Sequence, residues 1–98
     1  MNEVFVSFDI LCKLRQRGYK CNNARFEGHI YDVLKWLREE KKLHIELWTV
    51  GKKPIKWCHT ITTLNHLGEK QGWSSGKRGD SYEAAAIAGI EYCLDNLI

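Results

Sequence analysis

Apolar residues recur at helical spacing in three stretches of the chain. Near the N-terminus, Ser7 is a good N-cap for a short helix, and Gly18 supplies a stop signal for it. From Ile30 onward, apolar residues are spaced three, four and three apart, which predicts a helix with one buried stripe. A third stripe begins at Tyr82 and runs to the C-terminus, and we expect Asp80 to cap that helix. The pattern therefore predicts two helices early in the chain and one at its end.

Between these helices the apolar spacing changes to that of strands. Residues 43–50 and 55–63 alternate around the turn 51–54, which predicts a hairpin. A brief third strand is expected at 72–75, and a short strand is expected at 24–26 in the loop between the first two helices. Together these elements predict an α+β fold. It has a three-stranded antiparallel sheet, with two N-terminal helices and a C-terminal helix packed mainly on one face. The 98 residues are expected to form a single domain, 1–98.

The turn at 51–54 sets which side chains of the hairpin share a face. With the turn placed there, Trp48 is expected to face Trp57, and Val50 is expected to face Ile55. If all the helices pack on the other side, this apolar face is exposed and marks a protein interface, with self-association as the simplest case. If the first helix covers it, the same residues are core. The candidate interface residues are Trp48, Trp57, Val50 and Ile55.

Two predicted loops, 51–56 and 76–79, carry a second candidate site. Their basic residues are Lys52, Lys53, Lys56, Lys77 and Arg78. If the loops lie at the same end of the sheet, they form a basic patch near Trp48, Trp57 and Trp73. Aromatic rings beside basic loops suit single-stranded nucleic acid, through stacking and phosphate contact. In the alternative, the lysines are solvated turn residues and the tryptophans are core.

Composition and charge narrow the classes of function. Hydrophobic residues make up 44% and charged residues 28% of the chain, as in folded soluble domains. A net charge of +3 permits a nucleic-acid partner without demanding one. No apolar stretch approaches the roughly 20 residues that span a bilayer, and the N-terminus lacks the features of a signal peptide. We therefore expect a cytoplasmic protein with no membrane partner.

The chain offers little catalytic or metal-binding chemistry. Its four cysteines could form two disulfides, but a cytosolic location favours free thiols, and Cys93 falls on the apolar stripe of the last helix. No Cys-x-x-Cys or His-x-x-x-His spacing exists, so no metal and no cofactor is expected. In the expected register His59 lies opposite Glu46 and could form an acid–base pair, although a structural cross-strand contact is more common. We expect no enzymatic activity.

Several segments of the chain carry a family resemblance. They are Val4-Phe5-Val6-Ser7-Phe8, Val33-Leu34-Lys35-Trp36-Leu37-Arg38-Glu39-Glu40, Trp73-Ser74-Ser75, Asp80-Ser81-Tyr82-Glu83-Ala84-Ala85 and the ending Glu91-Tyr92-Cys93-Leu94-Asp95-Asn96-Leu97-Ile98. With them the chain resembles, over most of its length, small uncharacterised proteins of gut Bacteroidetes and their phages or mobile elements. The resemblance implies a cytoplasmic α+β domain with no established activity or ligand. It therefore assigns no functional residue.

A second likeness concerns topology alone. The predicted order of helix, three antiparallel strands and helix over residues 30–98 is similar to that of the double-stranded RNA-binding domain. That family contacts phosphates with basic residues at the start of its last helix. This chain has Asp80-Ser81-Tyr82-Glu83 there, which weighs against duplex RNA. Our leading hypothesis is a non-enzymatic interaction module that self-associates or binds a protein partner. The alternative is a nucleic-acid-binding accessory domain that uses loops 51–56 and 76–79.

Overall fold

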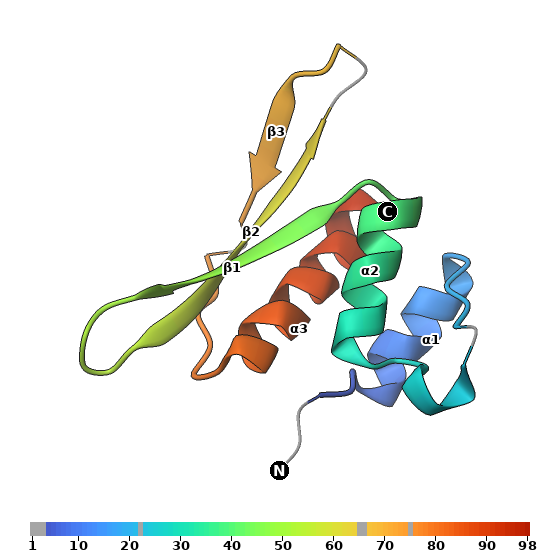
Figure 1. The fold of residues 1–98 in the computed structure, drawn as a ribbon, viewed down its shortest axis with the longest axis horizontal. Coiled ribbons are helices and arrows are strands. Elements are labelled where there is room, and N and C mark those ends of the chain that lie inside the picture. The colour runs from blue at the N-terminus through green and yellow to red at the C-terminus, as the bar shows by residue number, and fades with distance from the viewer. Residues whose placement is uncertain (1–3, 22, 65–66, 75) are drawn as a thin grey trace.

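The computed structural model describes residues 4–21, 23–64, 67–74 and 76–98. The elements in chain order are α1 (Phe8–Gln16), the 3-10 helix η1 (Ala24–Phe26), α2 (Ile30–Glu40), β1 (His44–Val50), β2 (Lys56–Leu64), β3 (Lys70–Trp73), α3 (Tyr82–Tyr92) and the π-helical turn η2 (Cys93–Leu97). The strands form one antiparallel sheet in the order β1-β2-β3 (Figure 1). The expected α+β fold is confirmed.

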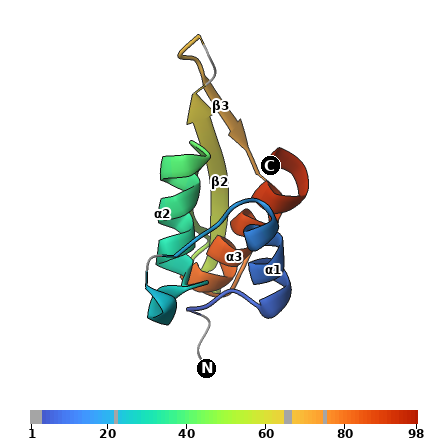
Figure 2. The ribbon, with the colours of Figure 1, turned by 90° about the vertical axis from the view of Figure 1, so that its right-hand side faces the viewer.

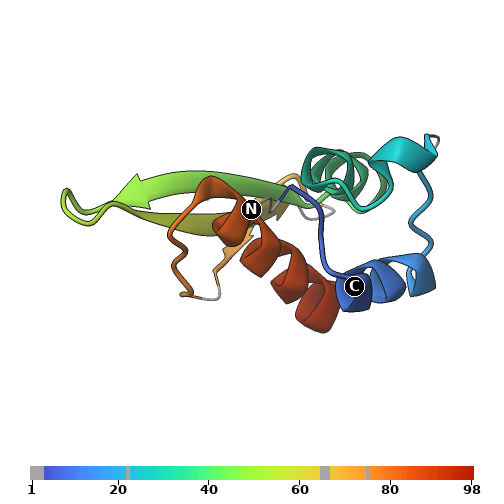
Figure 3. The ribbon, with the colours of Figure 1, turned by 90° about the horizontal axis from the view of Figure 1, so that it is seen from below.

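The helices gather on one side of the sheet. In Figure 1 they lie below and to the right of the strands, and Figure 2 views the molecule from that side, with α1 and α2 nearest and β2 and β3 behind. From below, Figure 3 shows α3 beneath β1 and β2. The molecule is flat, with extents of 41 × 39 × 19 Å. The largest fully buried side chains among the described residues form the core between the helices and the sheet: Leu14, Ile30, Val33, Leu37, His59, Ile61, Ile90, Cys93 and Leu94.

Side chains at the helix starts satisfy exposed backbone amides. The Ser7 hydroxyl accepts a hydrogen bond at 3.3 Å from a first-turn amide of α1, as predicted. At α3 the cap is Ser81, whose hydroxyl accepts from the Ala84 N–H at 3.1 Å. The expectation that Asp80 caps this helix is wrong, because its carboxylate pairs with Lys56 at the start of β2. The helix therefore starts one residue later than its sequence pattern indicates.

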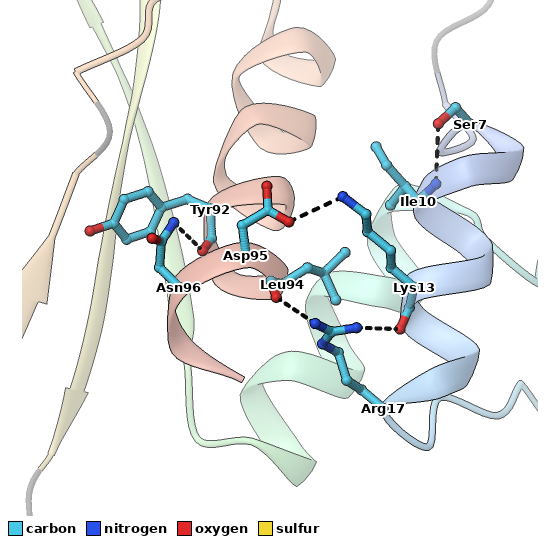
Figure 4. A network of polar contacts seen from close by, with 8 residues as sticks. All are labelled: Ser7, Ile10, Lys13, Arg17, Tyr92, Leu94, Asp95 and Asn96. Carbon is cyan, nitrogen blue, oxygen red and sulfur yellow. Dashed lines mark hydrogen bonds and ion pairs between the residues drawn. The ribbon is translucent and has the colours of Figure 1, made fainter.

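Polar contacts hold α1 against η2, the turn that follows α3. Lys13 pairs with Asp95 at 3.1 Å, and the Arg17 guanidinium donates to the Leu94 carbonyl at 2.9 Å (Figure 4). Exposed ion pairs of this kind stabilise by only about 0–1 kcal/mol. The position of α1 therefore depends more on burial of its apolar side, where Leu14 is fully enclosed.

Tyr19 anchors the segment between α1 and α2. Its phenol donates to the Asp32 carboxylate at 2.5 Å and accepts from the Gly28 N–H at 3.0 Å. Burial raises the pKa of Tyr19, and the hydrogen bond to Asp32 raises it further. Residues 24–26 are a 3-10 helix rather than the expected short strand, because the Asn23 side chain accepts from an amide of that turn at 3.0 Å.

The pairing of β1 with β2 differs by one residue from the expected register. Trp48 pairs with Cys58 rather than with Trp57. The cause is the length of the connection, since β2 begins at Lys56 and residues 51–55 join the strands. A shift of one residue turns every side chain of a strand to the opposite face. Trp57 therefore lies on the helix side of the sheet, and Trp48 lies on the other side.

The same shift separates His59 from Glu46. Glu46 pairs with Thr60, so the two residues of the hypothetical acid–base pair project from opposite faces. His59 is fully buried under α3, where a Cβ atom placed on Gly89 would lie 3.4 Å from its ring. Burial lowers the pKa of His59, and the positive charge of Lys77 lowers it further. The histidine therefore belongs to the core.

Candidate functional site

The helices leave one face of the sheet uncovered, which is the condition under which we expected an interface (Figures 1 and 3). We call this surface the open face. It consists of alternate residues of the two long strands: His44, Glu46, Trp48, Val50, Lys56, Cys58, Thr60 and Thr62. In the described part of the chain, α2 reaches only one end of this face, where Arg38 lines a pocket with His44 and Thr62.

Trp48 stands on the open face in a defined orientation. Its side chain is 46% exposed, and its indole N–H donates to the Thr60 hydroxyl at 3.0 Å. The ring therefore lies across β2, beside its register partner Cys58, which is only 7% exposed. A tryptophan that is already oriented loses little conformational entropy when a partner covers it. Such residues are typical anchors of protein interfaces.

The charges around Trp48 are paired. Lys70 approaches Glu46 at 4.0 Å, and Lys56 pairs with Asp80, which enters from the loop before α3. The hydrogen bond and the charge of Lys56 hold the pKa of the Asp80 carboxyl below its usual range. The open face thus has an aromatic centre and a rim of compensated charges. This composition is closer to a protein interface than to a polyanion site.

The four candidate interface residues do not all share this face. Trp48 and Val50 lie on it together, and Ile55 is 54% exposed in the connection between the strands. Trp57 is on the helix side, where its ring contacts Tyr82 with 5.3 Å between centroids. The expectation that Trp57 shares a face with Trp48 is wrong, because β2 pairs with β1 one residue out of the expected register.

The two basic loops meet at their bases. Trp57 and Gly79 exchange backbone hydrogen bonds, each 2.8 Å long, which place loop 51–56 beside loop 76–79. Of the candidate nucleic-acid contacts, Lys56 is engaged by Asp80, whereas the others are exposed: Lys52, Lys53, Lys77 and Arg78. Of the tryptophans, only Trp57 lies at this junction. Trp48 is on the open face, and Trp73 packs against the core.

A third surface was not predicted from the sequence. Five aromatic rings contact one another in the order Phe26, His29, Tyr31, Tyr82 and Trp57, with centroid distances of 6.1, 5.6, 6.2 and 5.3 Å. We call this row the aromatic strip. The elements that carry it start along the lower edge of the molecule in Figure 1. The strip lies on the helix side of the sheet, away from the open face.

The strip is not predictable from the sequence because its rings come from four segments of the chain. The sequence does give one indication of it, since Tyr31 and Tyr82 both lie in the first turn of a predicted helix. Parallel helices that start at the same edge would bring those two rings together. That α2 and α3 are parallel, however, is a property of the topology.

Pockets line the outer side of α2. A pocket of 300 Å³ lies within the strip, between Phe26, His29 and Tyr31, with Asp32 and Lys35 at its sides. It adjoins a pocket of 510 Å³ on the same helix, where Trp36 lies among acidic and basic side chains. The strip therefore borders a hollow surface.

A further pocket of 340 Å³ lies where α2 meets the sheet. Arg38, Lys42 and Lys70 surround it, with two threonines on its floor. Lys42 already donates to the Glu39 carbonyl at 2.8 Å. Arg38 and Lys42 lie at the C-terminal end of α2, where cations complement the negative end of the helix dipole.

The thiols of the chain do not form disulfides with one another in this structure. All four cysteines, each in the described part of the chain, are free, as expected, and burial raises the pKa of Cys93 to about 12. Among the described residues, no group of three or more His, Cys, Asp or Glu side chains is arranged to hold a metal ion. No helix in the same residues is long and apolar enough to cross a membrane.

Comparison of the chain with protein-family models, with curated proteins and with solved structures finds no match. The function is therefore argued from the open face, the basic loops and the aromatic strip.

Proposed function

We propose that this chain is a non-enzymatic binding module that contacts a protein with the open face of its sheet. The observation that carries the proposal is Trp48, an exposed and oriented ring at the centre of an uncovered face. A second copy of the chain or a different protein would bury this ring and exclude water from its hydrogen bond to Thr60, as happens at interface hot spots. We place this activity in the cytoplasm, where the free thiols stay reduced.

The test compares Trp48→Glu with Phe8→Ala. Phe8 is an exposed aromatic residue of α1 outside both the open face and the strip, so its variant controls for loss of a surface ring. Thermal melts first establish that both variants fold. Sedimentation velocity then measures self-association, and capture from nuclease-treated lysate measures partner binding.

We expect the Trp48→Glu variant alone to lose association. It should either shift a dimer to monomer or fail to retain a protein that both wild type and Phe8→Ala retain. A wild type that stays monomeric and retains nothing that Trp48→Glu loses would contradict the proposal.

We propose nucleic-acid binding as a second function, because the Trp57–Gly79 bridge joins the two basic loops. The double variant Lys77→Glu/Arg78→Glu should bind an oligonucleotide of about 12 nucleotides more weakly and with a smaller salt dependence. The control Lys20→Glu/Lys41→Glu changes the net charge equally outside both loops. Fluorescence anisotropy between about 0.05 and 0.2 M salt measures both effects. If both double variants lost the same affinity for the oligonucleotide, net charge alone would explain the loss, and a binding site at the loops would be contradicted.

A further inference from the structure

Two of the five rings of the aromatic strip are exposed to solvent. Phe26 is 50% exposed and Tyr31 is 58% exposed, while Tyr82 and Trp57 continue the row toward the basic loops. Phe5 adds a branch, because its ring meets His29 edge-on at 5.1 Å. Neighbouring rings of the strip lie 5.3 to 6.2 Å apart. Aromatic side chains beside basic residues are the surfaces on which unpaired bases stack.

His29 has a fixed position in the strip, and it supports the neighbouring ring of Tyr31. His29 is the N-cap of α2, and its Nδ1 accepts a hydrogen bond from the Tyr31 N–H at 3.2 Å. The imidazole stacks on the Tyr31 ring at an interplanar angle of 26°. A ligand that stacks on Tyr31 would therefore meet a prepared surface, with less ordering required at the moment of binding.

The charges along the strip leave a small positive excess. Two nearby carboxylates pair with cations, Glu27 with Arg15 and Asp80 with Lys56. Two others keep their negative charge: Asp32, which accepts from the Tyr19 phenol, and Glu83 in the first turn of α3. By contrast, the described residues provide no carboxylate partner for three cations placed along the strip, which are Arg25, Lys35 and Arg78. Arg25 adjoins Phe26, Lys35 lines the 300 Å³ pocket, and Arg78 adjoins the bridge to Trp57.

We propose that the aromatic strip is a stacking surface for single-stranded nucleic acid. Bases stack on Phe26 and Tyr31, and the backbone phosphates contact Arg25, Lys35 and Arg78. The ligand is a single strand because the bases of a duplex have their faces covered by their neighbours, whereas unpaired bases can be splayed onto rings. This inference rests on the second function proposed above, and it names Phe26 and Tyr31 as the stacking partners in place of the tryptophans of the sheet.

The test removes one ring at a time without changing charge. Tyr31→Ala and Phe26→Ala are compared with Tyr31→Phe, which keeps the ring, and with Phe8→Ala, which removes a ring outside the strip. Anisotropy is measured on single-stranded DNA and RNA of about 12 nucleotides and on a duplex of the same sequence. Thermal melts verify that each variant is folded.

We expect Tyr31→Ala and Phe26→Ala each to weaken binding about fivefold or more, since a base–aromatic stack contributes at least that factor. Tyr31→Phe and Phe8→Ala should bind like wild type. The salt dependence should stay unchanged in Tyr31→Ala, because no cation is lost, and it should fall in Lys77→Glu/Arg78→Glu. Comparison of DNA with RNA then shows which strand is preferred.

The outcomes separate this inference from the function on which it rests. If wild type binds and the basic-loop variant loses affinity while Tyr31→Ala does not, the loops bind and the strip does not. Equal affinity for duplex and single strand also overturns stacking. If wild type binds no oligonucleotide, both proposals fail, and loss of a protein partner in Tyr31→Ala would then assign the strip to protein contact.

Discussion

Neighbouring residues of β2 lie in two different environments. His59 and Ile61 are fully buried beneath the helices, whereas Thr60 and Thr62 belong to the open face and are partly exposed. Both sets use the same backbone and the same hydrogen-bonded ladder. The difference comes entirely from which side the helices cover. We infer that substitutions on the covered side act on folding, while those on the open face act on binding with little effect on stability.

We expect the largest difference in stability between the two faces from substitutions of adjacent residues of β2. Ile61→Ala should lower the free energy of unfolding by about 2–5 kcal/mol, because it leaves a cavity in a closed core. Thr60→Ala should change it by no more than about 0.5–1 kcal/mol, because only a partly exposed hydrogen bond to Trp48 is lost. Urea unfolding measures both. Similar losses in the two variants would mean that the open face is covered in solution.

The two tryptophans of the hairpin give the next largest difference. Trp57→Ala removes a half-buried ring from its edge-on contact with Tyr82 and should destabilise by about 2 kcal/mol. Trp48→Ala removes a more exposed ring, so we expect a smaller loss of stability and a complete loss of partner binding. Urea unfolding and the association assay together separate the two effects. If Trp57→Ala instead abolished association and left stability intact, the register of the hairpin would have to be revised.

Substitution of two glycines by alanine also compares the covered side of the sheet with the open face. A Cβ atom on Gly79 would lie 2.9 Å from the Ala84 Cβ and 3.0 Å from the Ala85 nitrogen, so Gly79→Ala must push α3 away from the sheet. We expect a loss of about 1–3 kcal/mol. On Gly72 of β3 the nearest atom would be the Ile61 carbonyl oxygen at 3.6 Å, an ordinary contact. Gly72→Ala should therefore melt within a few degrees of wild type, and equal melting shifts would argue against the close approach at Gly79.

Local sequence signals predicted the elements but not how they meet. The apolar spacing from Ile30 and the Ser7 cap correspond to α2 and α1, because a helix is determined by neighbours within a turn. The hairpin register depended on whether the connection ends at residue 54 or 55, and no local signal distinguishes the two. That single residue moved Trp57 from the expected interface to the helix side.

The candidate surfaces show the same division. The exposure of Trp48 could be predicted because the alternation of β1 alone places it on the face opposite the buried Ile45. The aromatic strip could not, since Tyr31 and Tyr82 meet only after α2 and α3 pack side by side. The basic loops likewise lie side by side because of the backbone bridge between Trp57 and Gly79, which no sequence motif predicts.

The smallest expected effect concerns a titratable residue on the covered side. Burial, assisted by the charge of Lys77, lowers the pKa of His59 below that of a histidine in the unfolded chain. As the pH falls below about 6.5, the unfolded chain binds a proton at this position while the folded chain does not. The free energy of unfolding contributed by neutral His59 is therefore fully present above that pH and is lost as the pH falls toward the folded pKa.

Urea unfolding of wild type and His59→Gln at about pH 7 and about pH 5 isolates this contribution from that of the other histidines. His59→Gln should be less stable than wild type at pH 7, because it disturbs the packing against Gly89, but it should lose less of its stability on acidification. Thr60→Ala, which leaves the imidazole in place, should keep the wild-type pH dependence. If His59→Gln and wild type lost equal stability on acidification, His59 would be protonated as readily in the folded chain as in the unfolded one. Water would then reach the imidazole, and the covered side of the sheet would be more open than its packing under α3 indicates.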